Sequence, residues 1–167
     1  MYFPFCHSYK SNYFDDIAER LVAWEVEIYQ LEKGKFTNAL EQFATRDVLL
    51  TTAQFGGHTH QIGSPPPGRK FAFVAEESTH LNWRKHNISE DSLMIFPKGG
   101  DLDVITPTGM TEVITISCND RLLKTLMPEL CSSSGKPSGD INSLKLLCLP
   151  RNETTFPSQR PRFWQSL

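Results

Sequence analysis

The fold of this chain is decided by the stretch Gly56-Gly-His-Thr-His-Gln-Ile-Gly-Ser-Pro-Pro-Pro-Gly68. Its three prolines form a rigid turn that neither a helix nor a central strand accommodates, because proline lacks a backbone N–H. Apolar, strand-like segments lie on both sides. His58 and His60 are two residues apart, so in a strand both imidazoles point to the same face. A β-barrel would present them to its interior in this way, where they hold a metal, line an organic pocket or lie inert.

Around this stretch, hydropathy alternates with a period of two. Residues 24–31 place Trp24, Val26, Ile28 and Gln30 on one face, and residues 36–43 alternate again after a glycine-containing turn. We expect these two segments to form a hairpin. Further strands are predicted at 48–55, 58–62, 70–75, 81–84, 93–96, 102–106 and 112–118. About eight or nine short strands at this spacing indicate a mainly β domain, a sandwich or a barrel.

Helices are predicted at both ends of the β region. Residues 14–21 carry apolar side chains at helical spacing, with Ser11 or Asn12 available as the N-cap. A second helix begins after Asn119 or Asp120, and Pro128 should kink or end it. Its apolar stripe either covers the β domain or packs against a second copy of the chain. The stripe consists of Leu122, Leu123, Leu126 and Leu130.

Composition excludes several classes of function. The 17 lysines and arginines are scattered and offset by 19 acidic residues, which is unfavourable for direct DNA binding by this chain alone. No apolar run approaches the ~20 residues that a membrane span requires. The N-terminus lacks the basic and apolar regions of a secretory signal, so we expect a cytoplasmic protein. The four cysteines form no Cys-x-x-Cys pair and are expected to be free thiols.

A series of short motifs occurs in order along the chain. They are Trp24-x5-Gln30-Leu31-x2-Gly34-x-Phe36, the histidine and proline stretch, Asn82-Trp83, and Leu93-x2-Phe96-Pro97-x-Gly99-x3-Asp103-x2-Thr106-Pro107-x-Gly109. This order resembles the sensor half of AraC/XylS-type transcription regulators, from about Asp15 to about Leu126. The resemblance implies a cupin-like barrel, a double-stranded β-helix or jelly roll, with a short N-terminal helix and C-terminal helices.

The same resemblance implies a division of the chain and a role. Residues 1–14 would be an N-terminal segment, residues 15–118 the barrel with its leading helix, and residues 119–167 a helical or irregular dimerisation or linker segment. Sensor halves of this family bind an effector or a partner and form homodimers through helices after the barrel. Members of the family also carry two helix-turn-helix motifs at the carboxyl end, and we expect no counterpart of these motifs after Leu126. DNA would therefore be bound only through a domain that this chain does not contain.

The strands supply candidates for an effector pocket. Aromatic residues are either barrel core or pocket wall, and the two histidines either line the pocket or lie at a strand end near the surface. Polar residues among apolar neighbours could orient a ligand, and they are Gln30, Asn38, Gln42 and Gln54. The ligand-binding set that we predict is His58, His60, Trp24, Gln30, Phe43 and Trp83.

A metal-dependent cupin enzyme is the principal alternative. Such enzymes use a His-x-His pair, an acidic ligand a few residues later and a third histidine in a later strand. His58 and His60 match the first element, but residues 61–64 contain no acid, and Leu102 occupies the position of the third histidine. Two imidazoles fall short of the three protein ligands that stable iron or zinc binding requires. We therefore expect no catalytic residues and no cofactor; a ligand-free protein-interaction module is the third alternative.

Overall fold

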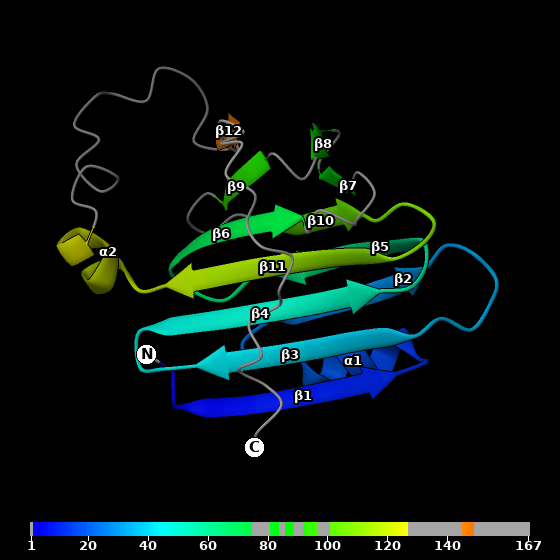
Figure 1. The fold of residues 1–167 in the computed structure, drawn as a ribbon, viewed down its shortest axis with the longest axis horizontal. Helices are drawn as coiled ribbons and strands as arrows, with labels where there is room; N and C mark the ends of the chain where they lie inside the picture. Colours follow the sequence, from blue (N-terminus) through cyan, green and yellow to red (C-terminus); the bar gives the residue numbers. More distant parts are fainter. Residues whose placement is uncertain are drawn as a thin grey trace, which may run out of the picture.

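A computed structural model describes residues 2–74, 81–83, 86–88, 92–96, 101–126 and 145–148 of the chain. Within these residues the protein is mainly β, with two antiparallel sheets and two helices (Figure 1). Sheet A contains, in order across the sheet, β1 (Phe5–Ser11), β3 (Asn38–Ala44), β4 (Val48–Phe55), β11 (Thr111–Cys118), β6 (Arg69–Val74), β9 (Ser92–Phe96) and β12 (Lys145–Cys148). Sheet B contains β2 (Glu25–Gln30), β5 (Thr59–Ser64), β10 (Leu102–Ile105), β7 (Leu81–Trp83) and β8 (His86–Ile88).

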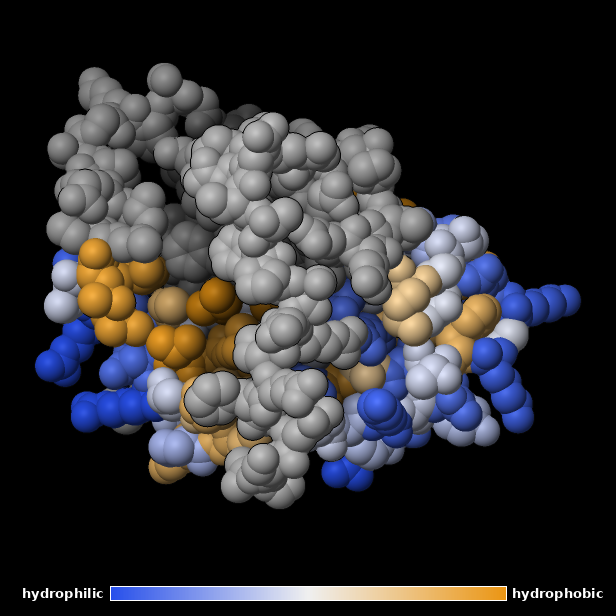
Figure 2. Space-filling model, viewed as in Figure 1, coloured by the Kyte–Doolittle hydropathy of each residue, from blue (hydrophilic) through white to orange (hydrophobic). Residues whose placement is uncertain are grey.

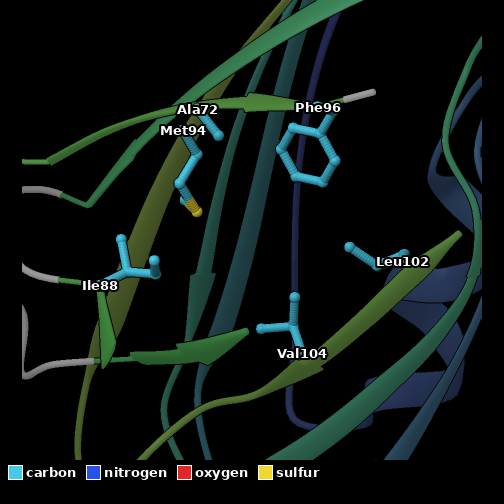
Figure 3. Packing of buried hydrophobic residues seen from close by; sticks show 6 residues of the cluster. All are labelled: Ala72, Ile88, Met94, Phe96, Leu102 and Val104. Atoms are coloured by element: carbon cyan, nitrogen blue, oxygen red, sulfur yellow. The ribbon is translucent and has the colours of Figure 1, made fainter. Parts of the chain in front are cut away.

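The two sheets pack face to face and bury their apolar faces against each other. Ala72, Met94 and Phe96 of sheet A point toward Ile88, Leu102 and Val104 of sheet B (Figure 3). A second buried cluster lies at the other end of the sheets and consists of Phe14, Ile17, Ile28, Leu40, Ala53 and Phe55. Phe14 and Ile17 come from α1 (Phe14–Arg20), so this helix covers the open end of the core.

The predicted hairpin between residues 24–31 and 36–43 is wrong. β2 pairs with β5 in sheet B, whereas β3 pairs with β1 and β4 in sheet A. The residues between them carry the chain from one sheet to the other. Ile28 of β2 and Leu40 of β3 still meet, but across the core in one buried cluster. Alternating hydropathy shows only that one face of each strand is apolar. It is equally compatible with two strands paired in one sheet and with two strands packed face to face in different sheets.

Sequence and structure agree on most other β elements, and they differ at the ends of the chain. The predicted strands at 48–55, 102–106 and 112–118 correspond to β4, β10 and β11. β1 and β12 pair into sheet A although they lie outside the predicted barrel limits of 15–118. α1 has Tyr13 as its N-cap with no side-chain capping bond, so the predicted caps are wrong. The hydroxyl of Ser11 instead bonds the carboxylate of Asp16 and accepts the backbone N–H of Tyr13.

The second predicted helix begins where expected. α2 (Asp120–Leu126) follows β11 directly, and the side-chain oxygen of Asn119 accepts the backbone N–H of Leu122 at 2.8 Å. Leu130 lies outside the described residues. In the described part of the chain, neither helix has the length and apolar character needed to cross a membrane.

A glycine in β5 allows the close approach of β5 to β2 in sheet B. Gly63 has φ +151°, and a Cβ atom on it would lie 1.9 Å from the carbonyl oxygen of Glu25 in β2. We predict that Gly63→Ala separates β2 from β5 and lowers the free energy of unfolding by about 3 kcal/mol or more.

The matched control is Gly109→Ala, because Gly109 also has positive φ (+94°) but meets no atom within 4 Å. We expect this variant to lose only about 1–2 kcal/mol from the backbone conformation. Urea denaturation of both variants checks the prediction, and equal losses would contradict the close contact with Glu25.

Candidate ligand cavity between the sheets

A cavity of about 60 Å³ lies between the two sheets. Sheet A lines it from β4, β6, β9 and β11, and sheet B from β2, β5 and β10. The connector between α1 and β2, residues 21–24, adds Leu21 and Trp24 to the wall. Five of the six residues drawn in Figure 3 also line the cavity, so the figure shows part of its apolar wall.

The part of the wall that the described residues form is almost entirely apolar and has no charged side chain. The polar side chains among the described lining residues are Thr51, Gln61 and Thr115, and Trp24 also carries an indole N–H. Two of these residues are already bonded to the protein. Thr51 Oγ1 accepts from Gln42 Nε2 at 3.0 Å, and Gln61 Nε2 donates to Thr59 Oγ1 at 3.2 Å.

The other two polar groups have no hydrogen-bond partner among the described residues. They are Trp24 Nε1 and Thr115 Oγ1, and both atoms are buried. Thr115 is 7% exposed and lies on the inner face of β11, directly opposite Thr51 in the strand register. A buried polar group without a partner costs about 1–3 kcal/mol. Such groups need an explanation in a native structure, and a ligand or an ordered water supplies one.

The connector that carries Trp24 is held by one buried amide. Gln42 Oε1 accepts the backbone N–H of Val22 at 2.9 Å, and Gln42 Nε2 donates to the carbonyl oxygen of Val22 at 3.2 Å. The next residue, Ala23, has φ +67°, a conformation that L-residues other than asparagine and aspartate seldom adopt. Backbone strain of this kind persists only where the surroundings enforce it. Gln42 therefore fixes the backbone two residues before Trp24.

Of the predicted ligand-binding residues, Trp24 lines the cavity, and Gln30 and Phe43 lie elsewhere. Gln30 is at the end of β2, where its amide donates to the carbonyl oxygens of Glu32 and Gly34. Phe43 is 43% exposed on the outer face of sheet A. Trp83 belongs to β7, which pairs with β10 beside the cavity, but its side chain lies outside the described residues.

The two histidines also lie off the cavity, because Thr59 and Gln61 form the buried face of β5. His60 faces outward, and its Nε2 lies 2.9 Å from Asp103 Oδ1. The backbone N–H of His58 donates to Glu32 Oε1 at 2.7 Å. A shift of one residue in a strand exchanges its two faces, and alternation alone does not say which face is inside. The expectation that both imidazoles point to the interior is therefore wrong for His60.

The outer face around His60 is acidic. The ring centroids of Tyr29 and His60 are 6.4 Å apart, and the hydroxyl of Tyr29 donates to Glu27 Oε2. That hydrogen bond, together with the negative charge of Glu27, raises the pKa of Tyr29. No group of three or more His, Cys, Asp or Glu side chains within the described ranges is arranged to hold a metal ion.

Other lining residues escaped the sequence analysis although a signal was present. Gln61 and Thr115 are polar residues at inward positions of otherwise apolar strands, the same pattern that singled out Gln42. Asn38 and Gln54, which were expected to orient a ligand, act elsewhere. Asn38 Oδ1 accepts the backbone N–H of Gly56, and Gln54 bonds Glu112 on the outer face of sheet A.

The leucines of α2 fall into distinct environments. Leu123 is buried at 5% exposure, Leu122 is half-buried and Leu126 is 66% exposed. In Figure 2, apolar surface gathers at the position that α2 has in Figure 1 and continues onto the neighbouring part of sheet A. The stripe therefore both anchors the helix and leaves an apolar edge in solvent.

No family model and no curated protein matches this chain. Among solved structures, the chain is similar to a conserved protein of unknown function from Pseudomonas aeruginosa PAO1. The two share 13% sequence identity with a TM-score of 0.37, over 58% of this chain and 59% of that chain. The function proposed below therefore depends on the geometry of this molecule.

Removing the amide of Gln42 should release the connector. Gln42→Leu preserves the approximate volume but leaves the backbone of Val22 and the hydroxyl of Thr51 without their partner. We predict a loss of about 3 kcal/mol in the free energy of unfolding. Amide hydrogen exchange in residues 21–24 should also become faster than in the unmodified protein.

The control is Gln54→Leu, because Gln54 bonds a side chain on the half-buried outer face. This change should cost less than about 1 kcal/mol and leave exchange in residues 21–24 unchanged. Equal exchange rates for the two variants would show that Gln42 does not hold the connector.

Proposed function

We propose that this chain is the effector-binding and dimerisation domain of an AraC/XylS-type transcription regulator. In this proposal the two sheets form a cupin-like barrel, and the protein binds without catalysing a reaction. The observation that carries the proposal is the cavity lined by both sheets and by the 21–24 connector. Most small-molecule sites are largely apolar cavities with a few polar groups, and this cavity has that composition.

The position of the cavity provides a route from ligand to partner. A molecule between the sheets contacts β11, which contributes Val113 and Thr115 to the wall. The same strand ends at Cys118, and α2 begins two residues later at Asp120. A ligand that binds one arrangement of β11 more tightly than another would shift the population of α2 positions. A DNA-binding domain attached beyond this chain would respond to that shift.

Two features of α2 support a role in forming a homodimer. Leu123 fixes the helix to its own domain, since its side chain is buried. Leu126 projects an apolar side chain into solvent one turn later, where a second copy could cover it. Exposed apolar surface next to a fixed helix is typical of a contact between proteins.

The metal-enzyme alternative fits the geometry less well. It requires two imidazoles at one site, whereas His60 is bonded to Asp103 on the outer face and neither histidine lines the cavity. An effector site in the cavity uses residues that already converge there.

The effector-site proposal predicts that filling the cavity abolishes ligand binding. Ala53 lines the cavity, so Ala53→Leu should occupy its volume while keeping the strand. A compound found by thermal-shift screening at about 100 times its Kd should raise the Tm of the unmodified protein by roughly 5–10 °C. It should have no effect on Ala53→Leu.

The matched control is Ala39→Leu, on the outer face of β3 opposite Gln54. This variant should retain the full ligand-induced rise in Tm. A compound that stabilises Ala53→Leu as much as Ala39→Leu would bind outside the cavity and contradict the proposed site.

The dimer proposal predicts that one exposed leucine is required for association. Leu126→Glu places a charge in the contact without disturbing the core, so we expect monomers that keep the fold of the unmodified protein. Multi-angle light scattering measures the change. Thr125→Glu, also exposed and adjacent, is the control and should remain dimeric. A dimer that survives Leu126→Glu would exclude this part of α2 as the interface.

A further inference from the structure

The chemistry of the cavity wall defines the class of molecule that fits it, and this inference rests on the effector-site proposal above. None of the lining residues that the structure describes has an acidic or basic side chain. A carboxylate or ammonium group would lose its hydration there without gaining an opposite charge, which is unfavourable. The ligand is therefore uncharged at the atoms that enter.

The number of free polar groups limits the polarity of the ligand. Among the described lining residues, Trp24 Nε1 and Thr115 Oγ1 are the fully buried side-chain atoms without a hydrogen-bond partner, whereas Thr51 Oγ1 accepts from Gln42. A sugar or other polyol would bury several hydroxyl groups against these two groups and the amide of Gln61, which are too few to pair with all of them. The indole is a donor, and the threonine hydroxyl is both donor and acceptor. One oxygen-bearing group on an otherwise apolar body matches this set.

The volume limits the size. A cavity of about 150 Å³ in another protein binds benzene, so one of about 60 Å³ accepts a molecule of only a few non-hydrogen atoms. Trp24, Phe55 and Phe96 give the wall aromatic faces against which such a body packs. A water molecule could meet the same polar groups, but it would leave these apolar faces without a partner.

We infer that the cavity binds a short-chain uncharged oxygen compound, such as a small ketone or alcohol. Its oxygen pairs with the Trp24 indole N–H and the Thr115 hydroxyl, and its carbon atoms contact the apolar wall. The affinity of so small a molecule is expected in the millimolar to high micromolar range, because each non-hydrogen atom contributes at most about 1.5 kcal/mol. Detection therefore requires a method that reports weak binding at a single site.

Thr115 and Thr51 provide a matched test of the site before any ligand is added. They are cross-strand neighbours on the inner face of β4 and β11, and both line the cavity. Of the two hydroxyls, that of Thr51 is hydrogen-bonded and that of Thr115 is not. Thr115→Val removes an unpaired buried group and should raise the Tm by about 2–6 °C. Thr51→Val breaks a bond and should lower the Tm by a similar amount. A fall in Tm for Thr115→Val would show that its hydroxyl is already satisfied and would overturn the inference.

Ligand binding is tested on the full chain by NMR with acetone and acetate, which have the same number of non-hydrogen atoms and differ in charge. Acetone should shift the indole N–H signal of Trp24 in a saturable way, and acetate should leave it unchanged. Trp24→Phe identifies that signal by its loss. Because Trp24→Phe lacks the indole signal, acetone binding to the variants is followed through the methyl signals of the lining residues Val104 and Val113. Trp24→Phe and Thr115→Val should each weaken acetone binding about fivefold to tenfold, and an unchanged affinity in both variants would overturn the inference.

Xenon separates failure of the ligand class from failure of the cavity itself. If xenon perturbs the methyl signals of Val104 and Val113 while acetone gives no saturable shift, the cavity is accessible and the ligand class is wrong. Equal binding of acetate and acetone would also overturn the class. Exclusion of xenon together with acetone would overturn both the class and the effector site proposed above.

Discussion

The buried amide of Gln42 connects three parts of the molecule that are distant in sequence. Its side chain leaves β3 in sheet A, bonds Thr51 on β4 and accepts and donates at the backbone of Val22 in the connector that leads to sheet B. In a low-dielectric core these bonds are costly to break, because every group that loses its partner stays unpaired. The amide thus holds the strained conformation of Ala23 and, through it, keeps Trp24 against the cavity.

The cavity follows from the way the two sheets share the apolar residues. Each sheet buries one face, and the buried faces meet at two clusters, one near α1 and one near β7–β10. Small residues such as Ala53 and Ala72 lie between larger ones, and the space they leave is the cavity. Empty volume in a core lowers stability, as does an unpaired hydroxyl such as that of Thr115. A cavity that lowers stability in both ways fits the proposed binding site better than it fits a core built for packing alone.

The link between cavity and surface is short. β11 passes along the cavity and continues into α2 through Asn119, whose side chain bonds the start of the helix and the carboxylate of Asp47. A change in the cavity wall therefore has a covalent path to the exposed Leu126, with no intervening flexible segment in the described residues. Under the proposed function, such a path would couple occupancy of the cavity to the exposed apolar surface of α2.

The sequence by itself determined the β-rich class, most strand positions and the start of α2, and it placed Trp24 on the face that lines the cavity. These features depend on local pattern, namely period-two alternation, glycine and proline turns and helix capping, which a single chain displays directly. Only the tertiary structure decided that β2 and β3 lie in different sheets, because alternating hydropathy does not distinguish strands paired in one sheet from strands packed face to face. It also decided that Thr59 and Gln61, rather than the histidines beside them, occupy the inner face of β5. The cavity brings together Thr115 and Trp24, which are about ninety positions apart in the chain, and no local pattern encodes such proximity.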